Sequence, residues 1–186
     1  TVFTPVLGSV RMRLPWLSLN LLLALIVTFV IERQTGIIQD EPILAALMPV
    51  IALLGGNGGF QSLAVVIRAL ATDDVPGTQV LPVLRRQLTI GVMNGAILAV
   101  IAGALAVLLI ETGVFDSGSS AISVALAVSI AALGNVTIAG LAGGGIPLLL
   151  RKLGFDPAQS SSIFLTLITD IVGFGGFLAV AALLLG

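Results

Sequence analysis

The chain of 186 residues is 58% hydrophobic and only 9% charged, and its mean hydropathy is +1.20. Soluble domains carry roughly 25% charged residues, so this composition predicts an integral membrane protein that contacts the lipid bilayer directly. Basic residues are few and the net charge is −1, so the chain lacks the electrostatic signature of a nucleic-acid-binding protein, and the absence of Cys and His excludes thiolate and imidazole metal sites. The chain begins at Thr1 and shows no signal peptide, so we expect it to be the membrane part of a longer protein.

Five apolar segments follow one another along the chain, and each can cross a hydrocarbon core that needs about 20 helical residues. They cover about residues 14–31, 42–71, 87–110, 120–150 and 157–185. Pro42 and Pro157 suit the first turn of a helix, and Asp156 suits the N-cap of the last one. The sequence therefore predicts an all-α membrane protein whose residues 1–186 form a single transmembrane domain.

The basic residues predict the orientation of these helices, because cytoplasmic loops collect Lys and Arg. Seven of the eight basic residues flank alternate loops, namely Arg11, Arg13, Arg68, Arg85, Arg86, Arg151 and Lys152. Only Arg33 lies on the other side, in the company of several acidic residues. We therefore predict a multi-pass protein of the plasma or inner membrane with a cytoplasmic N-terminus and an external C-terminus.

The second and fourth segments each contain Gly-Asn near mid-depth, at residues 56–57 and 134–135. The third and fifth each contain a polar residue at depth, Asn94 and Asp170. This pattern indicates either two related helical hairpins, which are common in transporters, or chance similarity in glycine-rich apolar sequence. The sequence leaves both interpretations open.

Asp170 is the only charged residue in the middle of the fifth segment. A charge at this depth costs about 2.5–3.5 kcal/mol, so it normally faces a water-filled cavity, an ion or a partner. Ser162 and Thr166 precede it at intervals of four residues and share its helical face, with Thr169 and Gly173 beside them. We predict that these residues line a pore. The structural alternatives are bonds from the two hydroxyls to their own helix, or a bond from Asp170 to another helix.

The second segment contains the glycine-rich stretch GGNGGFQ, in which Asn57 and Gln61 share a helical face next to Gly56. These residues can expose polar oxygens to an ion, or the glycines can simply allow tight helix packing. We predict Gly56, Asn57 and Gln61 as pore-lining residues. We interpret Pro49, Asn135, Gly144 and Pro147 as hinge or packing residues.

A single carboxylate among hydroxyls and amides suits Mg²⁺, which keeps most of its waters when it binds to one or two carboxylates. Ca²⁺ prefers more carboxylates, and Zn²⁺ and Cu⁺ prefer His or Cys. A two-fold dimer doubles any residue on its axis, so two Asp170 side chains can face one hydrated ion.

Two stretches resemble the signatures of MgtE-type magnesium transporters and their animal solute-carrier relatives. They are PVIALLGGNGGFQS, residues 49–62, and GFDPAQSSSIFLTLITDIVGF, residues 154–174. The resemblance implies a homodimer with five helices per subunit and a pore lined by the second and fifth helices. It also implies that Asp170 is the main site for hydrated Mg²⁺, that Ser162 and Thr166 face the pore, and that cytosolic Mg²⁺-sensing domains are missing from this chain. The family pattern leads us to expect a proline near Ile163 and a hydroxyl near Leu167, and both are absent.

The predicted function is passive Mg²⁺ uptake through a pore at the dimer interface, with Mg²⁺ both bound and transported. The main alternative is a proton- or sodium-coupled divalent cation transporter, in which Asp170 changes its protonation or its partner during transport. An intramembrane enzyme is disfavoured because an aspartyl protease needs a second acid at depth, and because the chain has no His. A purely structural membrane subunit does not explain a lone acid without a buried basic partner.

Overall fold

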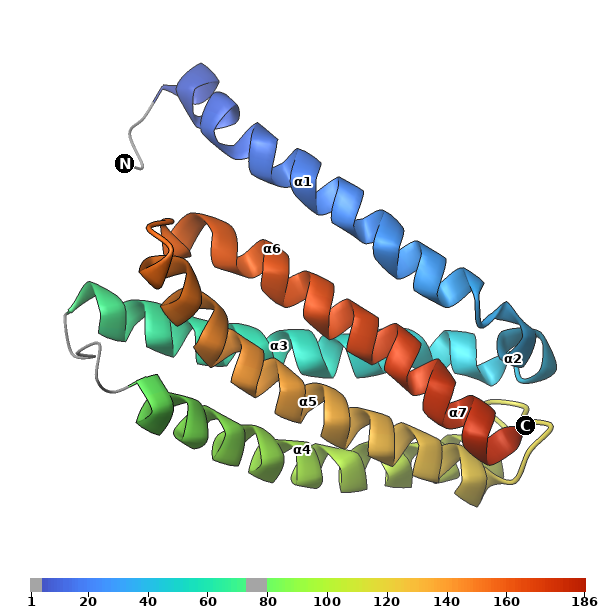
Figure 1. Ribbon diagram of the computed structural model, residues 1–186. Coiled ribbons are helices and arrows are strands. Elements are labelled where there is room, and N and C mark those ends of the chain that lie inside the picture. The colour runs from blue at the N-terminus through green and yellow to red at the C-terminus, as the bar shows by residue number, and fades with distance from the viewer. Residues whose placement is uncertain (1–4, 73–79) are drawn as a thin grey trace.

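The computed structural model describes residues 5–72 and 80–186, and the regular structure in these ranges is helical throughout. The elements are α1 (Val6–Glu32), α2 (Thr35–Asp40), α3 (Ile43–Ala71), α4 (Val80–Glu111), α5 (Ala121–Lys152), α6 (Pro157–Asp170), the π-helix η2 (Ile171–Gly176) and α7 (Phe177–Leu185). Figure 1 shows α3, α4, α5 and the α6–η2–α7 segment side by side as a bundle, with α1 on the outside and the short α2 at one end. Within the described residues, five helical spans are long and apolar enough to cross a membrane, which confirms the predicted all-helical class.

Two of these helices begin earlier than the hydropathy of the sequence predicts. α1 starts at Val6 and continues through Pro15, and α4 starts at Val80, although the apolar segments were predicted from about residues 14 and 87. The added turns carry Arg11, Arg13, Arg85 and Arg86. Long basic side chains can reach the headgroup region, so a helix can continue past the apolar segment that marks the hydrocarbon core.

The centre of the bundle is α5, which packs against α3, α4, α6, η2 and α7. Its buried face is rich in Ala and Gly, which allows neighbouring backbones to approach closely. At Gly140, for example, an added Cβ would lie 3.1 Å from the carbonyl oxygen of Gln87 on α4. The Ser129 hydroxyl donates to the carbonyl oxygen of Ala99, also on α4, at 2.9 Å. Close packing of small residues therefore fixes α4 and α3 on α5.

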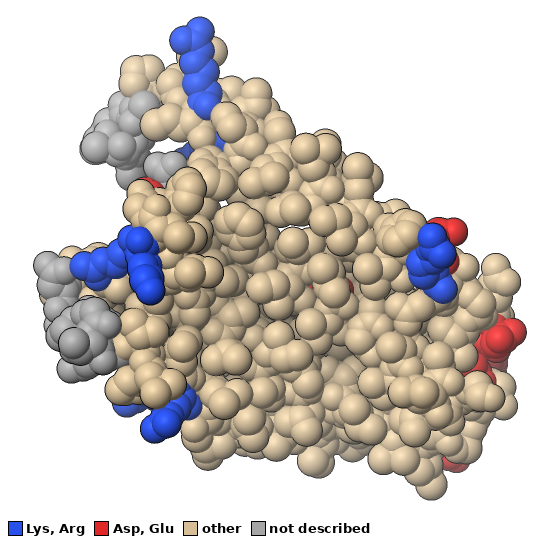
Figure 2. Space-filling view, in the orientation of Figure 1, with Lys and Arg blue, Asp and Glu red and all other residues tan. Residues whose placement is uncertain are grey.

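The charged residues separate toward the two ends of the bundle. Figure 2 shows most Lys and Arg side chains at the end where α3 and α5 finish and α4 begins, and most acidic side chains at the opposite end. At that opposite end, Arg33 lies 3.8 Å from Glu32 in an ion pair whose side chains are both 69% exposed. The basic residues predicted to share one side therefore do share one end, while its assignment to the cytoplasm remains a prediction.

Glu41 connects two loops at the end of the bundle opposite the basic one. It lies between α2 and α3 and is buried, and its carboxylate accepts hydrogen bonds from the loop that joins α4 to α5. The donors are the Ser117 hydroxyl at 3.2 Å, the Gly118 N–H at 3.1 Å and the Ser119 hydroxyl. Hydrogen bonds to a charged group contribute about 1.5–3 kcal/mol, so this acid holds the loop against the start of α3.

We expect Glu41→Gln to lower the stability of the folded chain by about 1–3 kcal/mol, because a neutral amide binds these donors less well and brings an N–H₂ group among them. The measurement is the unfolding midpoint of the purified chain in detergent. Asp40→Asn is the control, because Asp40 precedes Glu41 and is exposed. Equal midpoints for the two variants would show that the contacts of Glu41 do not stabilise the fold.

Candidate cation site

The helix that carries Asp170 begins with a well-formed cap. The Asp156 carboxylate accepts a hydrogen bond from the Ala158 N–H at 2.9 Å, and Pro157 occupies the first helical position. Both features were predicted from the sequence and are confirmed. The Ser160 hydroxyl also donates to the carbonyl oxygen of Asp156 at 2.8 Å. The start of α6 is thus fixed, and with it the rotation that places the later residues of the helix.

The structure places Ser162, Thr166 and Asp170 on one stripe of α6, and all three side chains are partly exposed. The neighbouring face of α6 is buried, since Ser161 and Leu165 are fully enclosed. This buried face meets α3 and α5, and an added Cβ at Gly59 of α3 would lie 2.9 Å from Leu165 Cδ1. The stripe therefore runs along the accessible edge of a helix whose other face is packed into the bundle.

Hydrogen bonds distinguish the hydroxyls of this region. Across the described residues, no hydrogen bond joins Ser162 or Thr166 to the carbonyl four residues earlier, so the predicted structural alternative for these hydroxyls is not observed. Thr169, by contrast, is buried and donates to the carbonyl oxygen of Thr166 at 3.1 Å. Gly173 is buried as well. Both residues were predicted to line a pore, and in the single chain they pack against neighbouring helices.

The Asp170 carboxylate has no hydrogen-bond or ion-pair partner among residues 5–72 and 80–186. The basic residues lie at the helix ends, and the alternative of a bond from Asp170 to another helix is not observed. A half-buried carboxylate without a partner in the described part of its chain needs water, a cation or a second subunit to remain charged. The Asp170 carboxylate is thus available to bind water, a cation or a second subunit at membrane depth.

A π-helix follows Asp170 immediately and covers Ile171–Gly176. The helical periodicity of the sequence does not predict this π-helix, although three glycines in six residues are a signal of unusual backbone geometry. π-helical turns are rare and occur frequently at functional sites, where the extra residue in the turn changes the direction of neighbouring side chains. Gly173 in this turn packs against Ala52 of α3, whose Cα would lie 2.9 Å from an added Cβ. The π-helix therefore lets the segment after Asp170 lie close against α3.

Asn135 of α5 ties these elements together. It is fully buried, and its Nδ2 donates to the carbonyl oxygen of Ile51 on α3 at 2.8 Å. A Cβ added at Gly55 would overlap this amide, and a Cβ added at Gly173 would lie 2.8 Å from Asn135 Nδ2. Only glycine therefore fits beside the amide at these two positions. Among the described residues its Oδ1 has no hydrogen-bond partner. Asn135 therefore packs at a junction of α3, α5 and η2, one turn from Asp170.

The structure separates Asn57 and Gln61 from the Asp170 stripe. Both side chains are exposed and line a groove between α3 and α4, together with Asn94. Gly56, in contrast, lies one turn after Ala52, on the side of α3 that meets η2, and it is partly exposed. Within one chain, therefore, Gly56 belongs to the side of Asp170, whereas Asn57 and Gln61 belong to a different surface.

The remaining predicted hinge or packing residues lie within continuous helices. Pro147 is buried inside α5, which runs unbroken from Ala121 to Lys152. Gly144 packs against α4, where an added Cβ would lie 2.7 Å from Gln87 Cγ. Pro49 is inside α3 and exposed. The contacts of Pro147, Gly144 and Asn135 are those of packing residues.

The donor set limits the kind of cation that this region can hold. In the described part of the chain, no three His, Cys, Asp or Glu side chains are close enough together to hold a metal ion. One carboxylate with nearby hydroxyls cannot replace the hydration shell of a divalent cation, but it can bind a cation that keeps most of its waters. The arrangement therefore favours a hydrated hard cation.

Comparisons with known proteins agree with this interpretation. Residues 48–180 match the model of the family MgtE, described as a divalent cation transporter. The magnesium transporter MgtE of Enterococcus faecalis is 32% identical over 165 residues, which are 89% of this chain and 34% of that protein. The magnesium transporters MgtE of Thermus thermophilus and Bacillus subtilis are each 30% identical, over 93% and 86% of this chain and 36% and 34% of their own length.

The chain thus spans about a third of the length of the curated relatives that it matches. The matched region includes both the glycine-rich part of α3 and the whole of α6 and η2. The family match also agrees with the five membrane-spanning helices and with a multi-pass membrane location. This chain belongs to the MgtE family of divalent cation transporters.

Proposed function

We propose that the chain conducts Mg²⁺ into the cell through a pore at the interface of a homodimer, and that Asp170 is the main binding site for the hydrated ion. The observation that carries the proposal is the partly exposed Asp170 carboxylate, which has no partner among the described residues of a chain from a divalent cation transporter family. The relatives named above are magnesium transporters, which supports Mg²⁺ as the ion.

The chemistry of the stripe supports a hydrated ion. Mg²⁺ loses its waters reluctantly and usually binds through one or two carboxylates while it keeps several waters. Among the described residues, the hydroxyls of Ser162 and Thr166 make no hydrogen bond to their own helix, so they can accept hydrogen bonds from such waters. Asp170 supplies the charge that attracts a cation and repels anions.

A two-fold dimer completes this site in the proposal. One chain offers the stripe on an accessible edge of the bundle, with Gly56 of α3 on the adjacent side. A two-fold axis along this edge places the same stripe on both sides of a shared pore, so two Asp170 carboxylates face one hydrated ion. The absence of a side chain at Gly56 keeps room beside the ion for its waters.

Passive transport needs no energy source beyond the membrane potential. The potential contributes about 2.3 kcal/mol per charge per 100 mV, and about twice as much for a divalent cation. No sequence motif for ATP binding occurs in the chain. The competing hypothesis is a transporter coupled to protons or sodium.

The test is a flux measurement on the purified chain in liposomes that contain a fluorescent Mg²⁺ indicator. With equal pH and equal sodium on both sides, we expect Mg²⁺ entry to continue and to increase when a potassium diffusion potential makes the interior negative. Liposomes with Asp170→Asn are the control for leakage. Entry that stops without a proton or sodium gradient would support the coupled transporter and contradict the proposed channel.

A further inference from the structure

The groove between α3 and α4 contains polar residues that the proposed Mg²⁺ site does not use. Asn57 and Gln61 of α3 and Asn94 of α4 line a cavity of about 310 Å³. We call this space the amide groove. It opens between two helices that both pack on α5 and have little contact with each other. Three amide side chains therefore share one accessible space within the membrane-spanning part of the chain.

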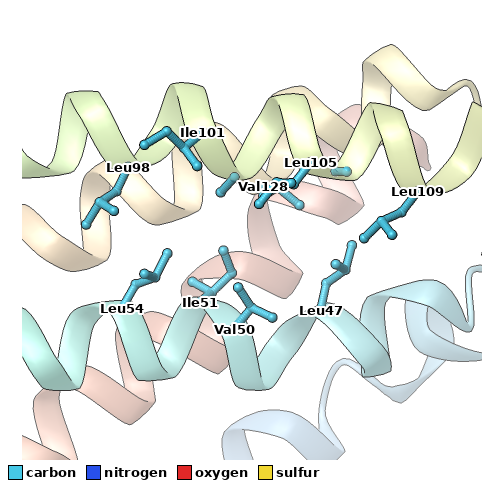
Figure 3. Close-up of a pocket in the computed structure, with 11 residues that line it drawn as sticks. Leu47, Val50, Ile51, Leu54, Leu98, Ile101, Leu105, Leu109 and Val128 are labelled. Atoms are coloured by element: carbon cyan, nitrogen blue, oxygen red, sulfur yellow. The ribbon is translucent and has the colours of Figure 1, made fainter.

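A second cavity continues in the same groove with a different lining. It has about 170 Å³ and is lined by apolar side chains, among them Leu47, Ile51, Ile101 and Leu105. Figure 3 shows these side chains projecting from α3 and α4 into the space between the two helices. Leu54 and Leu98 line both cavities, so they mark the boundary between the polar and the apolar part.

The depth of the three amides follows from helix geometry. Gln61 precedes Arg68 by seven residues, and Asn94 follows Arg86 by eight, so both lie about 10–12 Å from these arginines along their helices. Asn57 lies about 16 Å from Arg68 by the same measure, which is near the middle of a hydrocarbon core about 30 Å thick. The amides thus form a polar series from the basic end of the bundle to mid-depth.

Exposed amides at this depth need hydrogen-bond partners. Lipid chains offer none, and a polar group that loses its partners in hydrocarbon is strongly disfavoured. Water occupies about 30 Å³ per molecule, so a cavity of about 310 Å³ has room for a connected group of waters with the amides as anchors. The three amides carry no charge, and the cost of desolvating an ion rises with the square of its charge, so the lining suits water far better than a divalent cation.

We propose that the amide groove is a water-filled recess that opens at the basic end of the bundle and closes at Leu54 and Leu98. The apolar part beyond these residues excludes water, as hydrophobic constrictions do in channels. The recess brings water to the glycine-rich part of α3, because Gly58 is part of its lining. Because water in the recess replaces part of the apolar thickness beside α3, the membrane potential then falls across a thinner apolar layer there.

The 186 residues contain no cysteine, so the recess can be tested directly by introducing single cysteines. Ile97 and Ile101 lie four residues apart on α4 and are 58% and 50% exposed, but Ile97 lines the amide groove and Ile101 the apolar part. We compare Ile97→Cys with Ile101→Cys in native membranes, by the rate of modification with a permanently charged methanethiosulfonate reagent. Thiolate, the reactive form, is stable in water and disfavoured in apolar surroundings, so we expect Ile97→Cys to react at least about tenfold faster.

A second variant links the reaction to the amides. In the Ile97→Cys chain, Asn57→Leu together with Asn94→Leu should lower the rate to that of Ile101→Cys, while the detergent-solubilised chain keeps its elution volume. Equal rates for Ile97→Cys and Ile101→Cys would overturn the proposal: equally slow rates would show lipid in both parts of the groove, and equally fast rates would show water beyond Leu54 and Leu98. Disulfide-linked chains on oxidation of Ile97→Cys would also overturn it, because a second copy would then cover the groove. Neither outcome depends on Mg²⁺ transport, so failure here is distinct from failure of the proposed function.

Discussion

Replacing Asp170 with alanine is expected to abolish Mg²⁺ uptake while the chain still reaches the membrane. A carboxylate and a single charge attract each other by about 4 kcal/mol at 4 Å in surroundings of intermediate polarity, and a divalent cation roughly doubles this. A loss of only about 2 kcal/mol weakens the affinity of the site for the ion about thirtyfold. The measurement is growth and Mg²⁺ uptake of a cell that depends on the introduced transporter, with membrane expression followed in parallel.

The matched controls separate charge from shape and position. Asp170→Asn keeps the shape of the side chain and removes its charge, so we expect it to be as inactive as Asp170→Ala. Asp116→Asn removes an exposed acid from the loop between α4 and α5 and should leave uptake unchanged. Uptake at the wild-type level by Asp170→Asn would refute the assignment of the ion site, and the family membership of the chain would stand.

The sequence was sufficient to predict the helical class and the five membrane spans, because hydrophobic segments of sufficient length leave few alternatives in a bilayer. It was less informative about where helices end. α1 and α4 continue outward through basic residues. A hydropathy profile places such residues in loops, although a helix that carries basic residues can extend into the headgroup region. The short α2 also escaped prediction because six residues give too little periodicity to identify a helix.

Helical periodicity correctly placed Ser162, Thr166 and Asp170 on one accessible stripe, because their spacing of four residues fixes a shared face. Periodicity could not tell which neighbouring helix each face meets. It also gave Asn57 and Gln61 a shared face, and in the single chain this face lines the groove toward α4. Their place in a pore stays a prediction. The direction of a face depends on packing between segments far apart in the sequence.

The contacts of Glu41 and Asn135 show the same limit. Glu41 binds a loop about 76 residues later, and Asn135 donates to a carbonyl 84 residues earlier, so local sequence carries no sign of either bond. The π-helix after Asp170 also depends on long-range contacts, because Gly173 packs against Ala52 and Gly175 against Val30. The contacts of Asn135 and of the η2 glycines position the segment after Asp170, and all these features become visible only when the helices are assembled.

Two adjacent glycines of α3 provide the second large effect, because the structure assigns them opposite surroundings. An added Cβ at Gly55 would overlap the buried amide of Asn135, whereas an added Cβ at Gly56 would meet nothing within 4 Å. We expect Gly55→Ala to lower stability by about 1–3 kcal/mol, because overpacking forces the Asn135 junction apart. We expect Gly56→Ala to leave stability unchanged or to raise it by up to about 1 kcal/mol, because alanine favours the helix.

Mg²⁺ uptake should also differ between variants of Gly55 and variants of Gly56. Gly55→Ala should reduce the amount of folded chain, and the chain that remains folded should show weakened uptake because Asn135 also packs against the turn after Asp170. Gly56→Leu should fold normally and block uptake, because in the proposed dimer its side chain occupies the space beside the hydrated ion. Unfolding midpoints in detergent and Mg²⁺ uptake, measured on the same preparations, test both statements. A stable and active Gly55→Ala would contradict the tight contact with Asn135, and an active Gly56→Leu would place the pore away from this side of α3.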